Sequence, residues 1–259
     1  MTIGASFHAS TLSILLFFTC SSLPGQVKVR KTEGLEHGFL TLHDMDNKIL
    51  ASGDLTQIAS GTRVTSDLVF QFKDGSIHKE TTVFSQRGVF RLLTYHLVQK
   101  GPSFKHSIDM KIDCSTGQVT VLTTGPDGKE HSISDHLNLP SDLANGLVYT
   151  LMNDLDPKAL TTTVSMVVAM PKPRIVKLEI SADGEDSYSI GGVAHKAIRY
   201  AAKIHLGGVV GVVAPIVGKD PPATHIWMAG GKAPVVLKSE GILYEDGPIW
   251  RTEWASPVW

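Results

Sequence analysis

The sequence predicts a mainly β protein, a curved antiparallel sheet or incomplete barrel with one helix in the middle of the chain. Three observations lead to this prediction. Apolar and polar residues alternate over most of the chain, Asp-Gly pairs recur between the alternating stretches, and only residues 142–155 show helical spacing instead. Alternation with a period of two is typical of strands with one buried and one solvated face, the usual arrangement in antiparallel sheets.

The alternation is clearest in residues 104–113, where apolar side chains alternate with Lys, Ser and Asp. The same pattern occurs in residues 62–72, 176–180 and 198–206. Strands of roughly ten residues joined by short turns leave little room for crossover helices. We therefore expect neighbouring strands to be antiparallel and to follow one another as hairpins.

Glycine-containing pairs mark the turns that we predict between strands. Glycine accepts the positive φ angles of tight hairpin turns because it has no Cβ atom. The pairs are Asp74-Gly75, Asp127-Gly128, Asp183-Gly184, Asp246-Gly247 and, less typically, Ser52-Gly53.

One stretch predicts a helix. Ser141 can cap a helix over about residues 142–155, in which Leu143, Leu147 and Leu151 share one face, and Asp156-Pro157 would end it. Strand-like sequence lies on both sides, so we expect this helix to be an insertion that packs against the concave side of the sheet.

The N-terminus predicts a secretory leader. The first 27 residues contain no Asp, Glu, Lys or Arg, and Leu12–Phe18 form an apolar run that is too short to span a bilayer. We assign residues 1–25 to a signal peptide and 26–259 to a single β-rich domain, located in the periplasm or secreted, with no transmembrane span. The missing positive charge before the apolar run leaves open a misassigned start, a weak signal or a buried N-terminal strand.

Cysteine positions limit the covalent chemistry. The residues before Cys20 match a lipidation signal poorly, so we expect simple cleavage after Ser22 or Gly25. Cys114 would then be the only cysteine left, and the mature chain could form no internal disulfide. A lone cysteine is more often inert packing than a nucleophile.

Composition argues against nucleic-acid binding. The formal net charge is −1, charged residues make up 19% of the chain, and hydrophobic residues make up 42%. The densest basic run, Lys28–Lys31, directly follows the predicted leader, and we assign it to a solvated N-terminus. No basic face of the kind that nucleic acids require is indicated.

No motif predicts catalysis, a cofactor or a metal. The chain has no Gly-x-Ser-x-Gly sequence and no phosphate-binding glycine loop before a helix. The histidine pairs His131/His136 and His37/His43 lack the spacing of metal ligands. We therefore predict no catalytic residues, no cofactor and no metal ligands.

Two features could form a binding site for an apolar ligand. Residues 206–218, LGGVVGVVAPIVG, are uncharged and could form either buried core or an apolar lip over a cavity. The C-terminal aromatic residues could line a site, although a core closed by the last hairpin is the simpler interpretation. On the binding interpretation, the candidate ligand-binding residues are Val209, Val212, Ile216, Trp227 and Trp250.

Several segments resemble a set of exported bacterial β-rich proteins of unassigned function, over most of residues 35–259. They are residues 140–146 (PSDLANG), 171–174 (PKPR) and 225–227 (HIW), with Pro234 and Gly241. The hairpin from Trp227 to Lys238 is also similar to the last strands of periplasmic half-barrels, a group that includes lipoprotein carriers. That resemblance implies a curved sheet that wraps a helix and can shelter an acyl chain, and it supplies no binding residues.

We therefore expect a non-catalytic protein of the bacterial envelope that binds or carries an apolar, lipid-like small molecule, or has a structural role. The alternative is a secreted hydrolase that acts on polysaccharide or lipid. A glycosidase would need two carboxylates that converge across a cleft.

Overall fold

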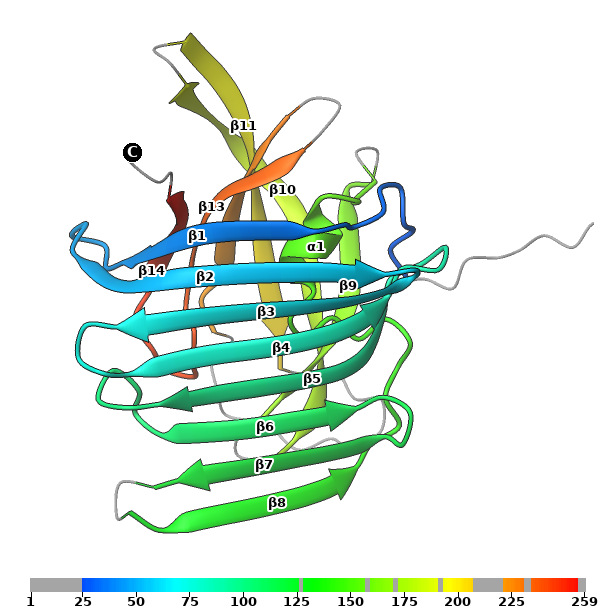
Figure 1. The fold of residues 1–259 in the computed structure, drawn as a ribbon. Coiled ribbons are helices and arrows are strands. Elements are labelled where there is room, and N and C mark those ends of the chain that lie inside the picture. The colour runs from blue at the N-terminus through cyan, green and yellow to red at the C-terminus, as the bar shows by residue number, and fades with distance from the viewer. Residues whose placement is uncertain are drawn as a thin grey trace, which may run out of the picture.

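The computed structural model describes residues 25–125, 128–156, 159–169, 172–190, 193–206, 221–230 and 234–255. These residues form one antiparallel sheet of fourteen strands and one short helix, α1 (Val148–Met152) (Figure 1). The strands are β1 (Glu36–His43), β2 (Ile49–Ser60), β3 (Arg63–Phe72), β4 (Ile77–Ser85), β5 (Arg91–Lys100), β6 (Ser107–Asp113), β7 (Gln118–Thr124), β8 (Glu130–His136), β9 (Thr161–Val168), β10 (Arg174–Ile190), β11 (Val193–His205), β12 (Thr224–Ala229), β13 (Val235–Gly241) and β14 (Trp250–Ala255).

The sheet consists of two meanders that join where the first strand pairs with the last. Its strand order runs β8 to β1, then β14 to β9, so every neighbouring pair except β1 and β14 is consecutive in the chain. The strands β9–β13 cross behind β1–β8 (Figure 1). Strands β8 and β9 form the two edges and do not pair with each other, so the sheet curves without closing into a barrel. This confirms the predicted mainly β, antiparallel fold.

Two hydrophobic clusters occupy the concave side. The larger cluster, which we call the main core, joins β3–β7 to β9–β12 through Leu143, Leu147 and Leu151 of the segment around α1. The smaller one, which we call the aromatic cluster, consists of Phe70, Phe72, Phe104, Tyr244 and Trp250 with neighbouring leucines. Its rings pack edge to face, with 5.3 Å between the centroids of Phe72 and Phe104. The last strand therefore does close a core, as the sequence suggested for Trp250.

The helix lies on the concave side as expected, but the predicted bounds of 142–155 are wrong. Helix α1 has only five residues, and Ser141 does not cap it. Asn145 instead hydrogen-bonds to the backbone N and O atoms of Val167 in β9, at 2.8 and 2.9 Å. Gly146 then takes a φ of +69°, which a helix cannot include. These long-range bonds to β9 override the local helical pattern.

Two of the predicted turns lie inside strands. Asp183-Gly184 is a bulge in β10, where the pairing with β11 shifts by one residue, and the strand continues to Ile190. Ser52-Gly53 lies within β2, and the ring of Phe70 occupies the space that a Cβ atom of Gly53 would need. Asp74-Gly75 is a turn with a positive φ of +85° at Gly75, as predicted.

The N-terminal segment is docked rather than solvated as a whole. Val27 is buried in the main core. The backbone N–H group of Lys31 donates to Asp154 Oδ1 at 2.8 Å, and that of Arg30 donates to the same oxygen. The prediction of a solvated basic run at Lys28–Lys31 therefore holds for the exposed residues Lys28 and Arg30, but the backbone of the run is anchored just after α1.

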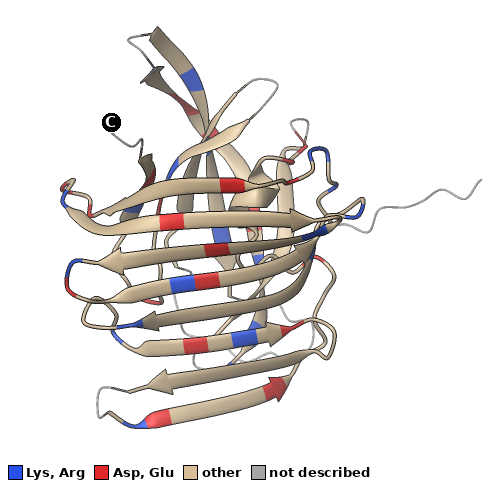
Figure 2. Cartoon of the chain, in the orientation of Figure 1, with Lys and Arg blue, Asp and Glu red and all other residues tan. Residues whose placement is uncertain are grey.

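Positions of charged residues of both signs are scattered along the strands in Figure 2. Among the described residues, no helix has the length and apolarity that crossing a bilayer would need. The predicted leader, residues 1–25, lies outside the described part of the chain except for Gly25.

Candidate ligand-binding cavity

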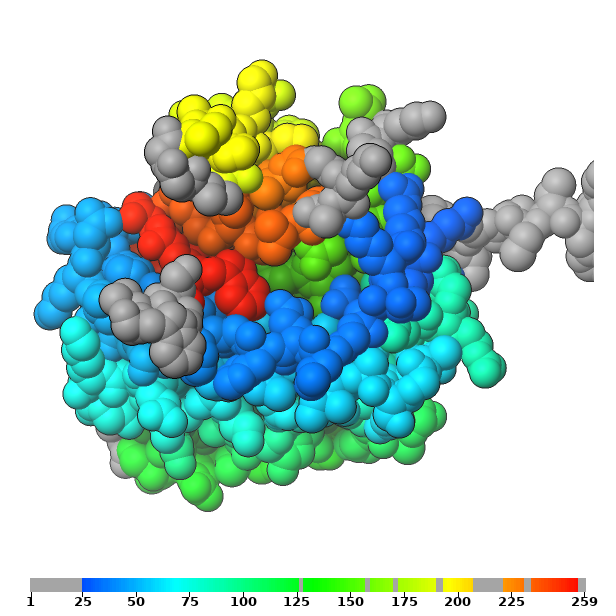
Figure 3. Space-filling model, turned by 45° about the horizontal axis from the view of Figure 1, so that its top comes forward, coloured from blue at the N-terminus to red at the C-terminus, as the bar shows by residue number. Residues whose placement is uncertain are grey.

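A cavity of about 320 Å³ lies on the concave side between the two meanders. In Figure 3 the molecule is hollowed between β1 and strands β13–β14, and the segment around α1 is visible at the bottom of the hollow. A volume of this size is at the lower end of the range for small-molecule sites, about 300–1,000 Å³. The residues that line the cavity come from both meanders and from α1.

One wall of the cavity is a row of polar side chains that crosses five neighbouring strands. Pairing aligns Tyr95 of β5, Thr82 of β4, Ser66 of β3, Gln57 of β2 and Glu36 of β1, and all five residues line the cavity. We call these residues the polar row. Because paired residues point to the same side of a sheet, an entire row faces inward together.

The next row along the same strands is mostly apolar. It runs from Glu80 of β4 through Leu68 to Leu55, and all three residues line the cavity. The third row contains His78, Phe70, Leu40 and Trp254. Most of the polar lining side chains on these strands therefore belong to the polar row. The share of apolar lining side chains increases toward the aromatic cluster.

The facing wall is mostly apolar, although Thr224, Lys238 and Ser239 also belong to it. Strands β9–β13 contribute Met166, Leu178, Ala202, Ile204, Ile226 and Val236 to the lining. Of these, Leu178, Ala202 and Ile226 also belong to the main core. The cavity thus has one wall rich in hydrogen-bonding groups and one mainly hydrophobic wall.

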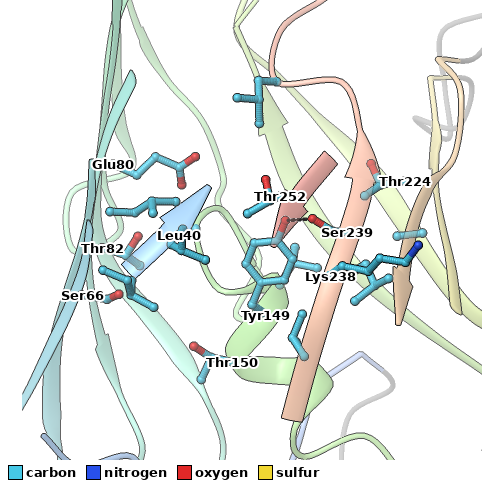
Figure 4. A pocket seen from close by; sticks show the side chains of 18 of the residues that line it. Leu40, Ser66, Glu80, Thr82, Tyr149, Thr150, Thr224, Lys238, Ser239 and Thr252 are labelled. Atoms are coloured by element: carbon cyan, nitrogen blue, oxygen red, sulfur yellow. Dashed lines mark hydrogen bonds between the residues drawn. The ribbon is translucent and has the colours of Figure 1, made fainter. Parts of the chain in front are cut away.

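Tyr149 of α1 projects between the two walls. Its hydroxyl lies 2.7 Å from Ser239 Oγ of β13, and Figure 4 shows this pair in the middle of the cavity. Burial raises the pKa of the Tyr149 hydroxyl above its ordinary value, so this group stays neutral at physiological pH. Tyr149 therefore fixes α1 to β13 while it lines the space.

A chain of hydrogen bonds orients Glu80. Gln99 Nε2 donates to the carbonyl oxygen of Leu243 at 2.7 Å, and the same nitrogen lies 2.9 Å from His78 Nδ1. A carbonyl oxygen only accepts, so the Gln99 amide is fixed and His78 Nδ1 must accept. His78 then carries its proton on Nε2 and donates it to Glu80 Oε1 at 2.9 Å.

Tyr95 also hydrogen-bonds to Glu80. Burial, together with the negative charge of Glu80, raises the pKa of the Tyr95 hydroxyl well above its ordinary value, so Tyr95 acts as a neutral donor. Glu80 is therefore held between two donors, and Figure 4 shows its carboxylate projecting from β4 toward the cavity.

Two more carboxylates lie in the lining, those of Glu33 and Glu36. Glu33 Oε2 accepts a hydrogen bond of 2.8 Å from Gln57 in the polar row. Partial burial is the largest cause of the raised pKa of both glutamates, and for Glu33 the neighbouring charge of Glu36 adds to it. The polar side of the cavity is therefore acidic.

The predicted ligand-binding residues do not gather in this cavity. Trp227 is buried, its Nε1 donates to Asp186 Oδ2 at 2.6 Å, and Lys238 lies over its ring. Trp250 belongs to the aromatic cluster, and neither tryptophan is among the lining residues. Val209, Val212 and Ile216 lie outside the described residues, so a core or lip role for residues 206–218 stays a prediction.

Inward-facing polar residues are the signal that the sequence analysis missed. Ser66 interrupts the apolar face of β3, and His78, Glu80 and Thr82 share one face of β4 with the buried Phe84. In the described part of the chain, no group of three or more His, Cys, Asp or Glu residues is arranged to hold a metal ion.

Comparisons with known proteins give one distant neighbour. It is the solved structure of a beta-barrel-like protein of domain of unknown function DUF1849 from Brucella abortus. Its sequence is 11% identical to this chain, and the two structures superpose with a TM-score of 0.44. The match covers 88% of this chain and 100% of that chain. No protein-family model and no curated protein matches the sequence.

Proposed function

We propose that the protein binds an amphipathic, lipid-like small molecule in this cavity without transforming it. The observation that carries the proposal is the polar row that faces a mostly apolar wall across one concave space. A ligand with an apolar chain and a polar end matches both walls, whereas a wholly apolar ligand would leave buried polar groups without partners. The predicted leader supports a place for this activity in the bacterial envelope.

The geometry gives less support to the alternative, a secreted hydrolase. His78 is the histidine among the lining residues, and its two ring nitrogens bond to Gln99 and Glu80, so no hydroxyl nucleophile is paired with it. Glu80 itself is held by two donors. This arrangement orients polar groups and does not provide an activated nucleophile.

Titration with a neutral fluorescent amphiphile, N-phenyl-1-naphthylamine, tests the proposal. Its emission should rise on binding to the wild-type protein. Ala202 is buried and lines the cavity, so Ala202→Phe should fill the space and abolish the rise. Lys203→Phe is the matched control because Lys203 is the exposed neighbour on the opposite face of β11. Equal binding by both variants would place the probe elsewhere and contradict the proposal.

A further inference from the structure

The charges that face the cavity are unbalanced. Glu33, Glu36 and Glu80 belong to its lining, and Lys238 is the lysine among the lining residues. Lys238 Nζ lies 4.1 Å from the centre of the Trp227 ring and 3.4 Å from Glu240 Oε1. Figure 4 shows this ammonium directed away from Tyr149. The positive charge of Lys238 is therefore engaged away from the carboxylates of the cavity.

His78 does not supply the missing positive charge. Its Nδ1 accepts from Gln99 and only its Nε2 donates, so both nitrogens are satisfied in the neutral form of the ring. The polar side of the cavity consequently holds carboxylates, hydroxyl groups and amides, with no cation from the described residues directed at Glu80.

An unpartnered hydroxyl lies next to Glu80. Thr82 is only 2% exposed and lines the cavity, yet no hydrogen bond joins its hydroxyl to a described residue. Ser66, its partner across the strand pair, is equally without a bond from its hydroxyl in the described part of the chain. A buried hydroxyl such as that of Thr82 normally has a partner, and Ser66 is half-buried, so both hydroxyls are available to a ligand atom. Figure 4 shows both side chains projecting from the same wall as Glu80.

We propose that the ligand of this cavity carries a cationic ammonium head group, which lies between Glu80 and the hydroxyls of Thr82 and Ser66. The inference rests on the proposed function, since it presumes that an amphipathic molecule occupies the cavity. Its apolar chain packs against the wall formed by β9–β13. An ammonium group donates three hydrogen bonds and needs acceptors, which a carboxylate and two hydroxyl oxygens provide.

The opposite charge is disfavoured at the same place. A carboxylate or phosphate head group would be removed from water beside Glu80, with Glu33 and Glu36 nearby, and like charges in a partly buried site repel strongly. A neutral alcohol can bond to the same hydroxyls without gaining from the carboxylates. The expected order of affinity is therefore ammonium, then alcohol, then carboxylate.

Isothermal titration with three ligands of identical chain tests this order. Decylammonium, decan-1-ol and decanoate differ only in the head group, and each is used at neutral pH below the concentration at which it aggregates. Decylammonium should bind about tenfold more tightly than decan-1-ol, the gain expected from a charge-assisted hydrogen bond. Decanoate should bind most weakly.

Two variants locate the head group. Glu80→Gln should remove the tenfold preference for decylammonium and leave the affinity for decan-1-ol unchanged. Glu253→Gln is the control, because Glu253 is next to the lining residue Thr252 but faces the other side of β14. If Glu80→Gln does not fold, Glu36→Gln replaces it, since Glu36 is exposed at the mouth and should still reduce the preference several-fold.

The outcomes separate the two proposals. If decanoate or decan-1-ol binds the wild-type protein as tightly as decylammonium, or if Glu80→Gln and Glu36→Gln both keep the preference, the cationic head group is wrong and the amphiphile site stands. If none of the three ligands binds, the proposed function itself fails.

Discussion

The side chain of Asn145 pairs with the backbone of Val167 as a neighbouring strand would. Its Nδ2 donates to the carbonyl oxygen at 2.9 Å, and its Oδ1 accepts from the amide at 2.8 Å. Nearby, the amide of Ala144 donates to Ser165 O at 2.8 Å, and the amide of Ser165 donates to Asp142 O at 3.1 Å. The segment before α1 thus covers the outer edge of β9, which would otherwise offer unpaired backbone groups to another chain.

Replacing Asn145 should therefore destabilise the protein. Asn145 is 2% exposed, and Asn145→Ala leaves one buried N–H and one buried C=O of Val167 unsatisfied. We expect a loss of about 2–4 kcal/mol in the free energy of unfolding, measured by urea denaturation. Asn138→Ala, at an exposed position of the same connection, should change it by less than about 0.5 kcal/mol. Equal losses would refute the role given to the Asn145 bonds.

Cys114 should be unreactive in the folded protein. Burial, and to a lesser extent the charge of Asp113, raises the pKa of its thiol to about 11. Because the thiolate is the reactive form, iodoacetamide should label Cys114 very slowly at pH 8 in the native state and rapidly in urea. Labelling followed by intact mass measures both rates. Fast labelling of the native state would show that the thiol is accessible and ionised.

The fold could be predicted from sequence because its signals are local. The alternation in residues 62–72 depends only on which side chains follow one another, and β3 occupies Arg63–Phe72. The helix bounds could not be predicted, since the bonds of Asn145 to Val167 link residues 22 positions apart. The apolar spacing of residues 143–155 is compatible with a helix until those bonds are known.

The lining of the cavity could not be predicted from the sequence, for a different reason. In β4, apolar residues occur on both faces, with Ile77 and Val83 on one and Phe84 on the other. Alternation alone cannot decide which face is buried, so His78, Glu80 and Thr82 gave no signal of pointing inward. The pairing of β4 with β3 and β5 decides it, and pairing is not visible in a single sequence.

Glu33 should make stability depend on pH. Its pKa is raised from 4.5, chiefly by burial, so the folded state binds a proton at pH values where the unfolded state has lost it. The free energy of unfolding contributed by Glu33 is thus highest below about pH 4.5 and falls as pH rises through the raised pKa. Urea denaturation across this range should show wild type losing stability relative to Glu33→Gln with rising pH. A difference that is constant with pH would contradict this assignment.

The absence of a side chain at Gly146 should be essential to the shape of the cavity at its base. Its φ is +69°, and an added Cβ atom would collide with Thr82 Oγ1 and with the ring of Tyr95, both in the polar row. Gly61 has nearly the same backbone, with a φ of +60°, but open space where its Cβ would lie. The two glycines therefore separate backbone strain from collision.

Gly61→Ala should lower the free energy of unfolding by about 1–2 kcal/mol, because alanine disfavours the left-handed conformation. Gly146→Ala should cost clearly more, because Thr82 or Tyr95 must also move, and it should weaken the binding of N-phenyl-1-naphthylamine by distorting the polar row. Urea denaturation and probe titration of both variants give the comparison. If the two substitutions cost the same and probe binding is unchanged, then Gly146 does not maintain the shape of the cavity, and the polar row tolerates displacement at its Tyr95 end.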